Sequence, residues 1–208
     1  MTETFDIAQH IFHSPELVSI VDDAIRFFIS TPLRRLPPAA SFIGSGVYSL
    51  YYTGDYPLYA ALAAANRHAV DRPIYVGKAV PPGWRTARAK DSETPDIMRR
   101  LQEHTRSIQQ TENLRIEDFQ CRFMILSGLE GDLIVPIEAG LIRRFKPIWN
   151  SVVDGFGNHD PGSGRYDQAK SAWDVLHPGR PWAAKLKGRA PDQQAVIESV
   201  KAALTDLN

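Results

Sequence analysis

Short runs of apolar and aromatic residues, each bounded by Gly or Pro, predict three β-strands in this chain. Val, Ile, Phe and Tyr dominate these runs, and such side chains favour the pleated, half-buried surface of a sheet. The predicted strands are residues 46–52, 73–78 and 119–126. Longer segments with apolar residues at helical spacing, or rich in Ala and Leu, predict helices over 57–67, 94–110 and 133–145. This alternation predicts an α+β fold in which a small mixed β-sheet is flanked by helices.

Amphipathic helices are also predicted near both ends of the chain. Ser14 is a good capping residue and Pro15 suits the first helical position, so a helix should begin there and continue to Ile29. A second apolar stripe at helical spacing runs from Pro191 to Leu204. We interpret the chain as a single domain, residues 1–208, with a core over about 44–165 and helical extensions over 1–43 and 166–208.

The composition is that of a globular protein. A length of 208 residues with 43% hydrophobic residues allows one domain with a sizeable core. No run of about 18 apolar residues is present, and the N-terminus lacks a basic stretch followed by an apolar one. We therefore expect no spanning helix, no signal peptide and no membrane partner. Cys121 is the single cysteine, which excludes an intramolecular disulfide and a cysteine-based zinc site; a buried thiol in a reducing cytoplasm fits.

The charges balance overall but are unevenly distributed along the chain. A net charge of zero, taken alone, argues against a nucleic-acid partner. Residues 72–108, however, carry 8 basic and 4 acidic side chains, and residues 141–190 carry 9 and 4. Phosphate binding needs a local basic face rather than a basic protein, so both segments are candidates for such a face. Ordinary fluctuation of charge is the alternative interpretation.

Two of the predicted strands carry a tyrosine each, Tyr48 and Tyr75. If these strands pair in one sheet, the two phenol groups come near one another. Gly77, just beyond the second tyrosine, would let another backbone or a phosphate approach closely. The alternative is a buried ladder whose tyrosines only pack on the core.

Further polar residues occupy the predicted helices downstream. Arg100 and His104 are four residues apart and therefore share one helix face, although such a pair alone would be expected in solvent or paired with Glu103. Glu138 lies among apolar residues of the last core helix, where a carboxylate must face outward or find a partner or a metal. Asn150 follows just beyond the end of that helix.

In this order the residues resemble the GIY-YIG nuclease superfamily. The first half-motif stands as Gly46-Val47-Tyr48 and the second as Tyr75-Val76-Gly77, each with valine in place of isoleucine, which keeps shape and β-propensity. The resemblance covers Gly46 to about Arg165. It looks closest to the branch that contains type II restriction endonucleases, because a Gly-rich segment over 154–160 follows Asn150.

The resemblance implies a catalytic set composed of Tyr48, Tyr75, Lys78, Arg100, His104, Glu138 and Asn150. Glu138, a hard oxygen ligand, would hold one Mg²⁺, and the planar fork of Arg100 suits a phosphate oxygen. Tyr48 would orient or deprotonate the attacking water if nearby cations favour its phenolate; otherwise His104 would relay the proton. Tyr75 would fix geometry, and Asn150 would hold its loop or the phosphate.

Two loops are candidates for contacts with double-stranded DNA. The first combines an aromatic side chain with cations, and the second is rich in Gly, Asn and Asp. Their candidate residues are Trp84, Arg85 and Arg88 in the first loop and Asn158, His159 and Arg165 in the second. Either loop could instead be an ordinary polar connection on the surface.

Three functions remain open from the sequence. The first is a restriction endonuclease that acts as a homodimer on a palindromic, possibly GC-rich DNA site, as the resemblance implies. The second is a nuclease of another role, such as DNA repair, a mobile element or an RNA target. The third is a nucleic-acid-binding protein without catalysis, which the full set of polar residues disfavours.

Overall fold

The structure is a computed structural model that describes residues 5–84 and 93–205. Its centre is a four-stranded sheet with the order β1-β4-β2-β3, in which every pairing of the described strands is antiparallel. The strands are β1 (Arg34–Arg35), β2 (Gly46–Tyr52), β3 (Tyr75–Ala79) and β4 (Phe119–Ile125). The predicted α+β class is therefore confirmed, and three strands lie where the sequence predicts them.

The sheet is antiparallel rather than mixed, and the segment between β2 and β3 explains the difference. A helix between two strands often crosses the sheet and makes them parallel. Here the chain returns to the end of the sheet where β2 finished, so that the Ile74 amide donates to the Leu50 carbonyl at 2.8 Å. The strands consequently run in opposite directions, with Tyr48 opposite Gly77.

The predicted helices are present, and two short ones join them. α1 begins at Pro15, where the Ser14 hydroxyl accepts from the Leu17 amide at 3.3 Å as a helix cap. The helices are α1 (Pro15–Ser30), α2 (Ala60–His68), α3 (Asp96–Gln109), α4 (Ile134–Phe145), α5 (Ile148–Ser151), α6 (Ala172–Leu176) and α7 (Gln193–Thr205). The sequence did not predict α5, α6 or β1, because five residues or fewer show no measurable periodicity.

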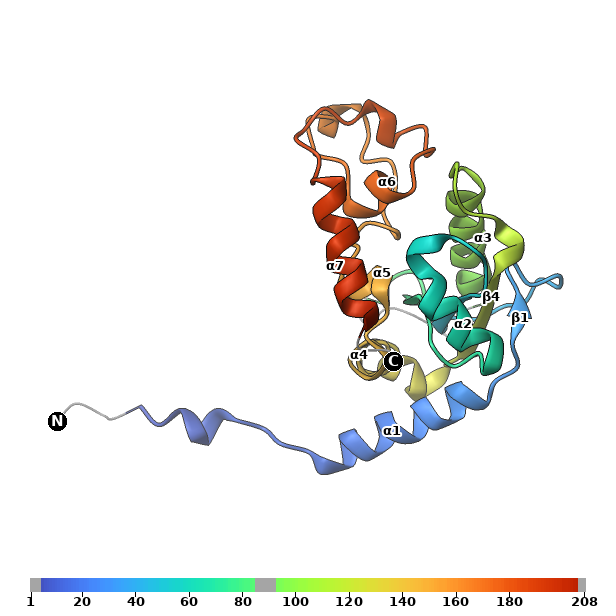
Figure 1. The fold of residues 1–208 in the computed structure, drawn as a ribbon. Helices are drawn as coiled ribbons and strands as arrows, with labels where there is room; N and C mark the ends of the chain where they lie inside the picture. Colours follow the sequence, from blue (N-terminus) through green and yellow to red (C-terminus); the bar gives the residue numbers. More distant parts are fainter. Residues whose placement is uncertain (1–4, 85–92, 206–208) are drawn as a thin grey trace.

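Helices cover both faces of the sheet (Figure 1), and the alternation of side chains along β2 explains how. Successive residues of a strand point to opposite faces. Tyr48, Leu50 and Tyr52 belong to the larger apolar cluster, which also includes side chains of α2, α3, α5, α6 and α7. Val47 belongs to the smaller cluster, which α1 and α4 cover. Both faces of β2 are therefore packed against helices.

The segment before α1 extends away from the rest of the molecule (Figure 1). Its apolar side chains are exposed, with Phe12 at 86% and Phe5 at 75%. Further along, the inner face of α1 packs on α4, where Gly140 leaves room for Val21 and Ile25. The exposed apolar side chains of the segment before α1, such as Phe5 and Phe12, are typical of a surface that contacts another molecule.

The region after β4 closes over the larger cluster with aromatic side chains. Trp149 packs edge-on against Trp173 with ring centroids 5.7 Å apart, and both rings contact His177. Val200 and Leu204 attach α7 to the same cluster. The C-terminal residues thus complete the core of the domain.

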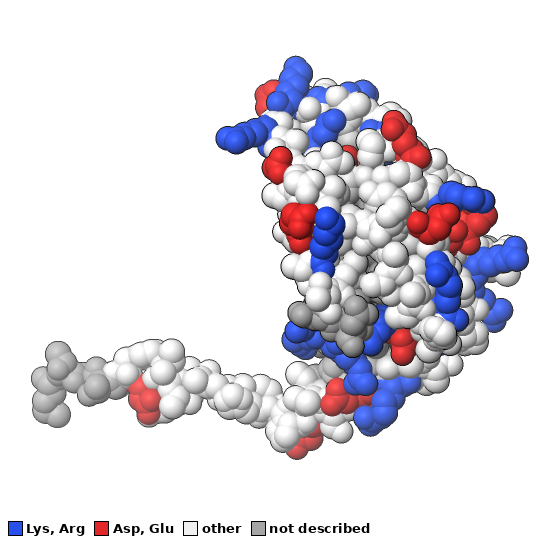
Figure 2. Space-filling view, in the orientation of Figure 1, with Lys and Arg blue, Asp and Glu red and all other residues white. Residues whose placement is uncertain are grey.

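Surface charge is mixed on the face of the molecule in Figure 2, where Lys and Arg lie beside Asp and Glu. Among the described residues, no helix combines the length and apolar character that crossing a membrane requires. Cys121 is buried in β4, as predicted, and burial raises the pKa of its thiol to about 12.

Candidate active site

The candidate site begins with the pairing of the two half-motifs across β2 and β3. Tyr48 lies directly opposite Gly77, and a Cβ atom at Gly77 would lie 2.6 Å from the Tyr48 hydroxyl oxygen. The missing side chain therefore lets the Tyr48 ring lie across β3 toward the free edge of the sheet. The sequence predicted a close approach at Gly77, and within the protein that approach comes from the Tyr48 ring.

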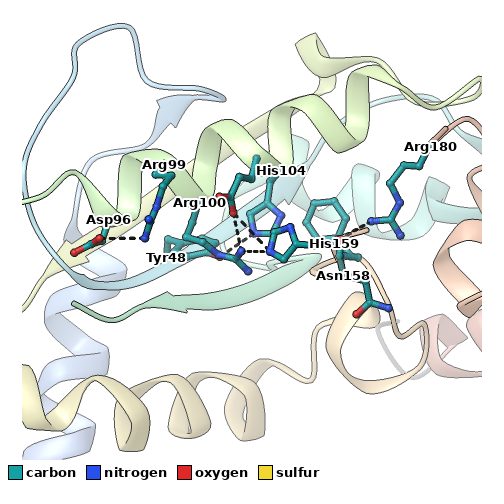
Figure 3. Close-up of polar contacts among 10 residues, drawn as sticks. Tyr48, Asp96, Arg99, Arg100, His104, Asn158, His159 and Arg180 are labelled. Atoms are coloured by element: carbon teal, nitrogen blue, oxygen red, sulfur yellow. Dashed lines mark hydrogen bonds and ion pairs between the residues drawn. The ribbon is translucent and has the colours of Figure 1, made fainter. Parts of the chain in front are cut away.

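Helix α3 brings Arg100 and His104 to the same place (Figure 3). The hydroxyl of Tyr48 and Nε2 of His104 are 2.8 Å apart, and both side chains are buried. Nη1 of Arg100 donates to the Glu103 carboxylate at 2.7 Å and also to Nε2 of His159 at 2.6 Å. The shared helix face that the sequence predicted thus faces the tyrosines, and Arg100 also makes the contact with Glu103 that was its alternative.

Burial sets the protonation of the Tyr48–His104 pair. Burial, and then the neighbouring Tyr75, raise the pKa of Tyr48 well above its ordinary value, against the smaller opposing effect of Arg100. Burial, and then the charge of Arg100, hold the pKa of His104 well below its ordinary range. A neutral phenol therefore donates to a neutral imidazole. A Tyr48 phenolate is disfavoured in this state, because the effect of burial on the pKa of Tyr48 outweighs that of the cations.

Tyr75 lies on the same face of the sheet as Tyr48. Its ring centroid is 6.3 Å from that of Tyr48 and 5.1 Å from that of His104, to which it presents an edge. Burial raises the pKa of Tyr75, and the charge of Arg100 opposes this rise. These contacts fit the positional role predicted for Tyr75.

Lys78 of β3 and Glu138 of α4 approach from the other face of the sheet. Lys78 lies opposite Val47, hence on the face that α4 covers, and its ammonium forms an ion pair with Glu138 of α4. Because β3 is an edge strand, side chains from both faces can meet beyond it. Glu138 is near enough to raise the pKa values of Tyr48 and Tyr75, although it is not the largest cause in either case.

Asn150 stabilises the free edge of β3. Its Oδ1 accepts from the Val76 amide at 2.8 Å, and its Nδ2 donates to the Val76 carbonyl at 2.9 Å. One side chain thus satisfies the two edge groups of Val76 that an additional strand would otherwise pair with. Asn150 therefore supports the backbone of β3 next to Tyr75, and its predicted role toward its loop or the phosphate stays a prediction.

The predicted DNA-contact residues lie at different places. Asn158 and Arg165 are exposed, His159 contacts Arg100, and Trp84 is half-buried rather than exposed. Arg165 uses its Nε to donate to the Pro161 carbonyl at 2.9 Å. The remaining two residues of this prediction, Arg85 and Arg88, lie outside the described residues.

Two residues that contact this cluster or its surroundings were not predicted from the sequence. Phe156 stacks on His104 with centroids 4.5 Å apart and planes 16° apart. Arg180 is buried and donates to the loop that carries Phe156. A possible signal was an arginine between Trp173 and Trp182 in a segment rich in Pro and Gly, since tryptophan faces attract guanidinium groups.

A hard divalent cation suits the donor atoms at the free edge of β3. Among the described residues there is no group of three or more His, Cys, Asp or Glu side chains that could hold a metal. A single carboxylate is nevertheless sufficient for Mg²⁺, which retains several waters and shares ligands with substrate phosphates. Glu138 offers this carboxylate within electrostatic range of Tyr48 and Tyr75, so the residues present fit the ion.

A guanidinium fork, a carboxylate and a phenol–imidazole pair thus gather at one free edge of the sheet, and these groups suit phosphodiester chemistry. Comparison with protein families agrees, because the family model described as Eco29kI GIY-YIG domain matches residues 40–204. The chain belongs to this family of GIY-YIG type II restriction endonucleases and carries its nuclease domain. The match continues through α7, beyond the resemblance found in the sequence. Among curated proteins the comparison finds no match.

Proposed function

We propose that this protein is a type II restriction endonuclease that hydrolyses phosphodiester bonds in double-stranded DNA at a specific site, with Mg²⁺. The observation that carries the proposal is the hydrogen bond of 2.8 Å between Tyr48 and His104, placed beside Arg100 and near Glu138. Phosphodiester hydrolysis needs an oriented water and positive charge on the phosphorane-like transition state. The described residues supply both.

Tyr48 and His104 act together on the attacking water in this proposal. Tyr48 accepts a proton from the water while its own proton passes to Nε2 of His104, a neutral nitrogen with a lone pair, 2.8 Å from the Tyr48 oxygen. The resulting hydroxide forms the new bond to phosphorus as the bond to the leaving oxygen breaks. The pair thus avoids a free phenolate, which burial makes costly.

Positive charge comes from the residues around the pair. Arg100 turns its guanidinium fork to a nonbridging oxygen, exchanging its contact with Glu103 or His159 for the phosphate. Tyr75 fixes the position of the phosphate, Lys78 contributes a second cation, and Asn150 keeps β3 in place. Each of these side chains lies at or next to the free edge of β3.

Glu138 is the residue that would hold Mg²⁺. The ion supplies positive charge on the phosphate oxygens and lowers the pKa of a bound water when it is present. The carboxylate of Glu138 is paired with Lys78, so Mg²⁺ would take the place of the Lys78 ammonium beside it.

Digestion of plasmid DNA with the purified protein tests the proposal. Discrete bands with Mg²⁺, and intact DNA after EDTA is added, are the expected results. A smear would instead favour a nuclease of another role without a specific site. Binding without cleavage under all divalent ions would favour the non-catalytic interpretation and would contradict the proposed function.

We also propose that two subunits act on a palindromic site. One site of this kind cuts one strand, so a double-strand break at a palindrome calls for two sites related by a two-fold axis. The exposed apolar residues of the N-terminal segment, such as Phe12 and Val18, support a surface for a second copy. The loops around Trp84 and Asn158 would then read the bases of a GC-rich site.

Sedimentation of the protein on a short duplex tests the assembly. The duplex carries one cleavage site mapped on the plasmid, and two chains per duplex are expected. One chain per duplex that cuts both strands together would contradict the dimer.

A further inference from the structure

Arg180 is almost completely buried, 2% exposed, although it lies in an irregular segment far along the chain from the half-motifs. Its Nη1 donates to the carbonyl oxygens of Phe156 at 3.1 Å and Asn158 at 3.2 Å, and its Nη2 donates to that of Gly155 at 3.0 Å. One guanidinium therefore holds three carbonyl groups of the segment 155–159, which we name the 155–159 loop. Figure 3 shows Arg180 reaching this loop from the side opposite Arg100.

The guanidinium of Arg180 is itself fixed on all sides. Its Nε donates to Oδ1 of Asp174 at 2.7 Å, in an ion pair whose two side chains are 1% and 2% exposed. Oδ2 of Asp174 accepts from the Ser171 hydroxyl at 2.7 Å. The rings of Trp173 and Trp182 lie 4.4 and 4.6 Å from the guanidinium carbon. A buried charge with this many partners has little freedom to move, and loss of one partner is costly.

The 155–159 loop in turn contacts three side chains of the candidate active site. Phe156 stacks on His104 at 4.5 Å between centroids and presents an edge to Tyr75 at 4.9 Å. Nε2 of His159 accepts from Arg100 at 2.6 Å. The loop can turn toward the site because Gly155 has a φ of +98°, a conformation that side chains rarely adopt.

We propose that Arg180 is the positioning residue of the active site: by holding the 155–159 loop it fixes Phe156 on His104 and His159 on Arg100. The catalytic consequence rests on the proposed nuclease function, whereas the placement of His104 does not. Arg180 touches neither substrate nor reacting atoms, and it acts through the loop.

Only arginine can make this set of contacts. Its planar fork offers five N–H donors in fixed directions, and here they serve one carboxylate and three carbonyl groups. The ammonium of a lysine is a point charge with three donors and would leave some of these acceptors unpaired. A loop that is loosened by about 1 Å near a reacting group can lower a rate by about 10²-fold.

Arg180→Lys, compared with Arg122→Lys, tests the proposal. Arg122 is a matched control, because its guanidinium also donates to three backbone carbonyls, those of Ile29, Thr31 and Val70, and lies over the Tyr51 ring. It lies on the face of the sheet opposite Tyr48 and Tyr75, and none of its described contacts is with a residue of the candidate site. Both variants alter hydrogen bonds to three backbone carbonyls, and Arg180→Lys also alters the buried contact with Asp174, so the rates are compared alongside the Tm of each variant.

The rate is measured in single turnover at saturating protein, on a duplex that carries a mapped cleavage site. Arg180→Lys should cleave about 10²-fold more slowly while the Kd for the duplex in Ca²⁺ stays unchanged. Arg122→Lys should keep the wild-type rate even where its loss of Tm is as large. Equal rates in the two variants would overturn the proposal, as would a loss that appears only in Kd.

A second measurement concerns geometry and needs no cleavage. Phe156 stacked on His104 shifts the imidazole proton resonances of His104 through its ring current. Arg180→Lys, and Asp174→Asn should the lysine variant fail to fold, are expected to remove this shift, and Arg122→Lys to retain it. Failure of the wild type to cut DNA would contradict the proposed function alone. An unchanged His104 shift in Arg180→Lys and in Asp174→Asn would contradict the positioning role.

Discussion

Two tyrosine–histidine pairs in this protein have the same hydrogen bond and different surroundings. In both pairs, Tyr48–His104 and Tyr59–His177, the hydroxyl oxygen and Nε2 are 2.8 Å apart and the side chains are buried. Burial lowers the pKa of both histidines, that of His177 to about 3. By internal geometry and protonation alone, either pair could move a proton.

In the second pair, Tyr59–His177, both side chains have a further hydrogen-bond partner inside the core. Nδ1 of His177 donates to Oδ1 of Asn113 at 2.9 Å, which leaves Nε2 to accept from Tyr59. The Tyr59 oxygen accepts in turn from the Trp149 indole at 2.9 Å. Aromatic rings surround this network, so its hydrogen bonds connect parts of the core. It stabilises the fold and offers no position for a substrate.

The first pair borders charged groups at the free edge of the sheet. Arg100 and Glu138 both influence the pKa of Tyr48, and neither has a counterpart in the contacts described for Tyr59. A buried tyrosine–histidine hydrogen bond is therefore a poor signal of a site by itself. What distinguishes the two is a fork for phosphate and a carboxylate within electrostatic range.

The largest expected effect is that of Glu138→Gln, which removes the feature most specific to the first pair. Loss of the metal's carboxylate should abolish cleavage, whereas DNA binding measured in Ca²⁺ should remain because no base contact is changed. Cleavage of a mapped duplex at several Mg²⁺ concentrations measures the effect. Glu198→Gln on the exposed side of α7 is the control, and near-normal cleavage by Glu138→Gln would disprove the metal assignment.

Removal of one hydroxyl from each pair compares them directly. Tyr48→Phe should lower turnover by about 10²–10⁴-fold, the contribution typical of a positioned acid–base group. Tyr59→Phe should retain cleavage but lose about 1–3 kcal/mol of unfolding free energy for each buried group left unpaired. Both values come from single-turnover rates and urea unfolding, and a larger rate loss in Tyr59→Phe would reverse our assignment of the two pairs.

The sequence could predict the first pair but not the second. Tyr48 and Tyr75 stand in short strands with clear turn residues, and Arg100 and His104 follow helical spacing, so their elements and their shared face could be derived. Tyr59 and His177 are 118 positions apart, and neither spacing nor composition relates them. Local patterns carry no information on such long-range contacts.

Arg180 and the direction of β3 escaped prediction for related reasons. Arg180 lies in an irregular segment, and its proposed positioning role depends on hydrogen bonds to carbonyl groups of a loop more than twenty positions away. The helix between β2 and β3 was correctly predicted, but its sequence does not tell at which end of the sheet the chain returns. Both depend on tertiary packing rather than on local propensity.

The charge around the first pair is tested by Arg100 variants. Arg100→Ala should lower the cleavage rate by about 10²–10³-fold, as loss of a transition-state donor does elsewhere, and Arg100→Lys should restore it only in part because lysine lacks the planar fork. Arg99→Ala, one residue away and paired with Asp96, is the control. Full activity of Arg100→Lys would mean that a point charge suffices.

The smallest expected effect is on pH-dependent stability, where the two pairs should behave alike. A histidine with a lowered pKa stays neutral in the folded protein but takes up a proton in the unfolded chain below about 6.5. Each therefore lowers the free energy of unfolding as the pH falls from about 6.5 towards the folded pKa, which is about 3 for His177, with a limiting slope of roughly 1.4 kcal/mol per pH unit. His177→Gln should flatten this slope in urea unfolding between neutral and acidic pH while cleavage at neutral pH persists. His104→Gln should flatten the slope similarly and also lose cleavage, and an unchanged slope in either variant would show that its histidine is not held neutral by burial.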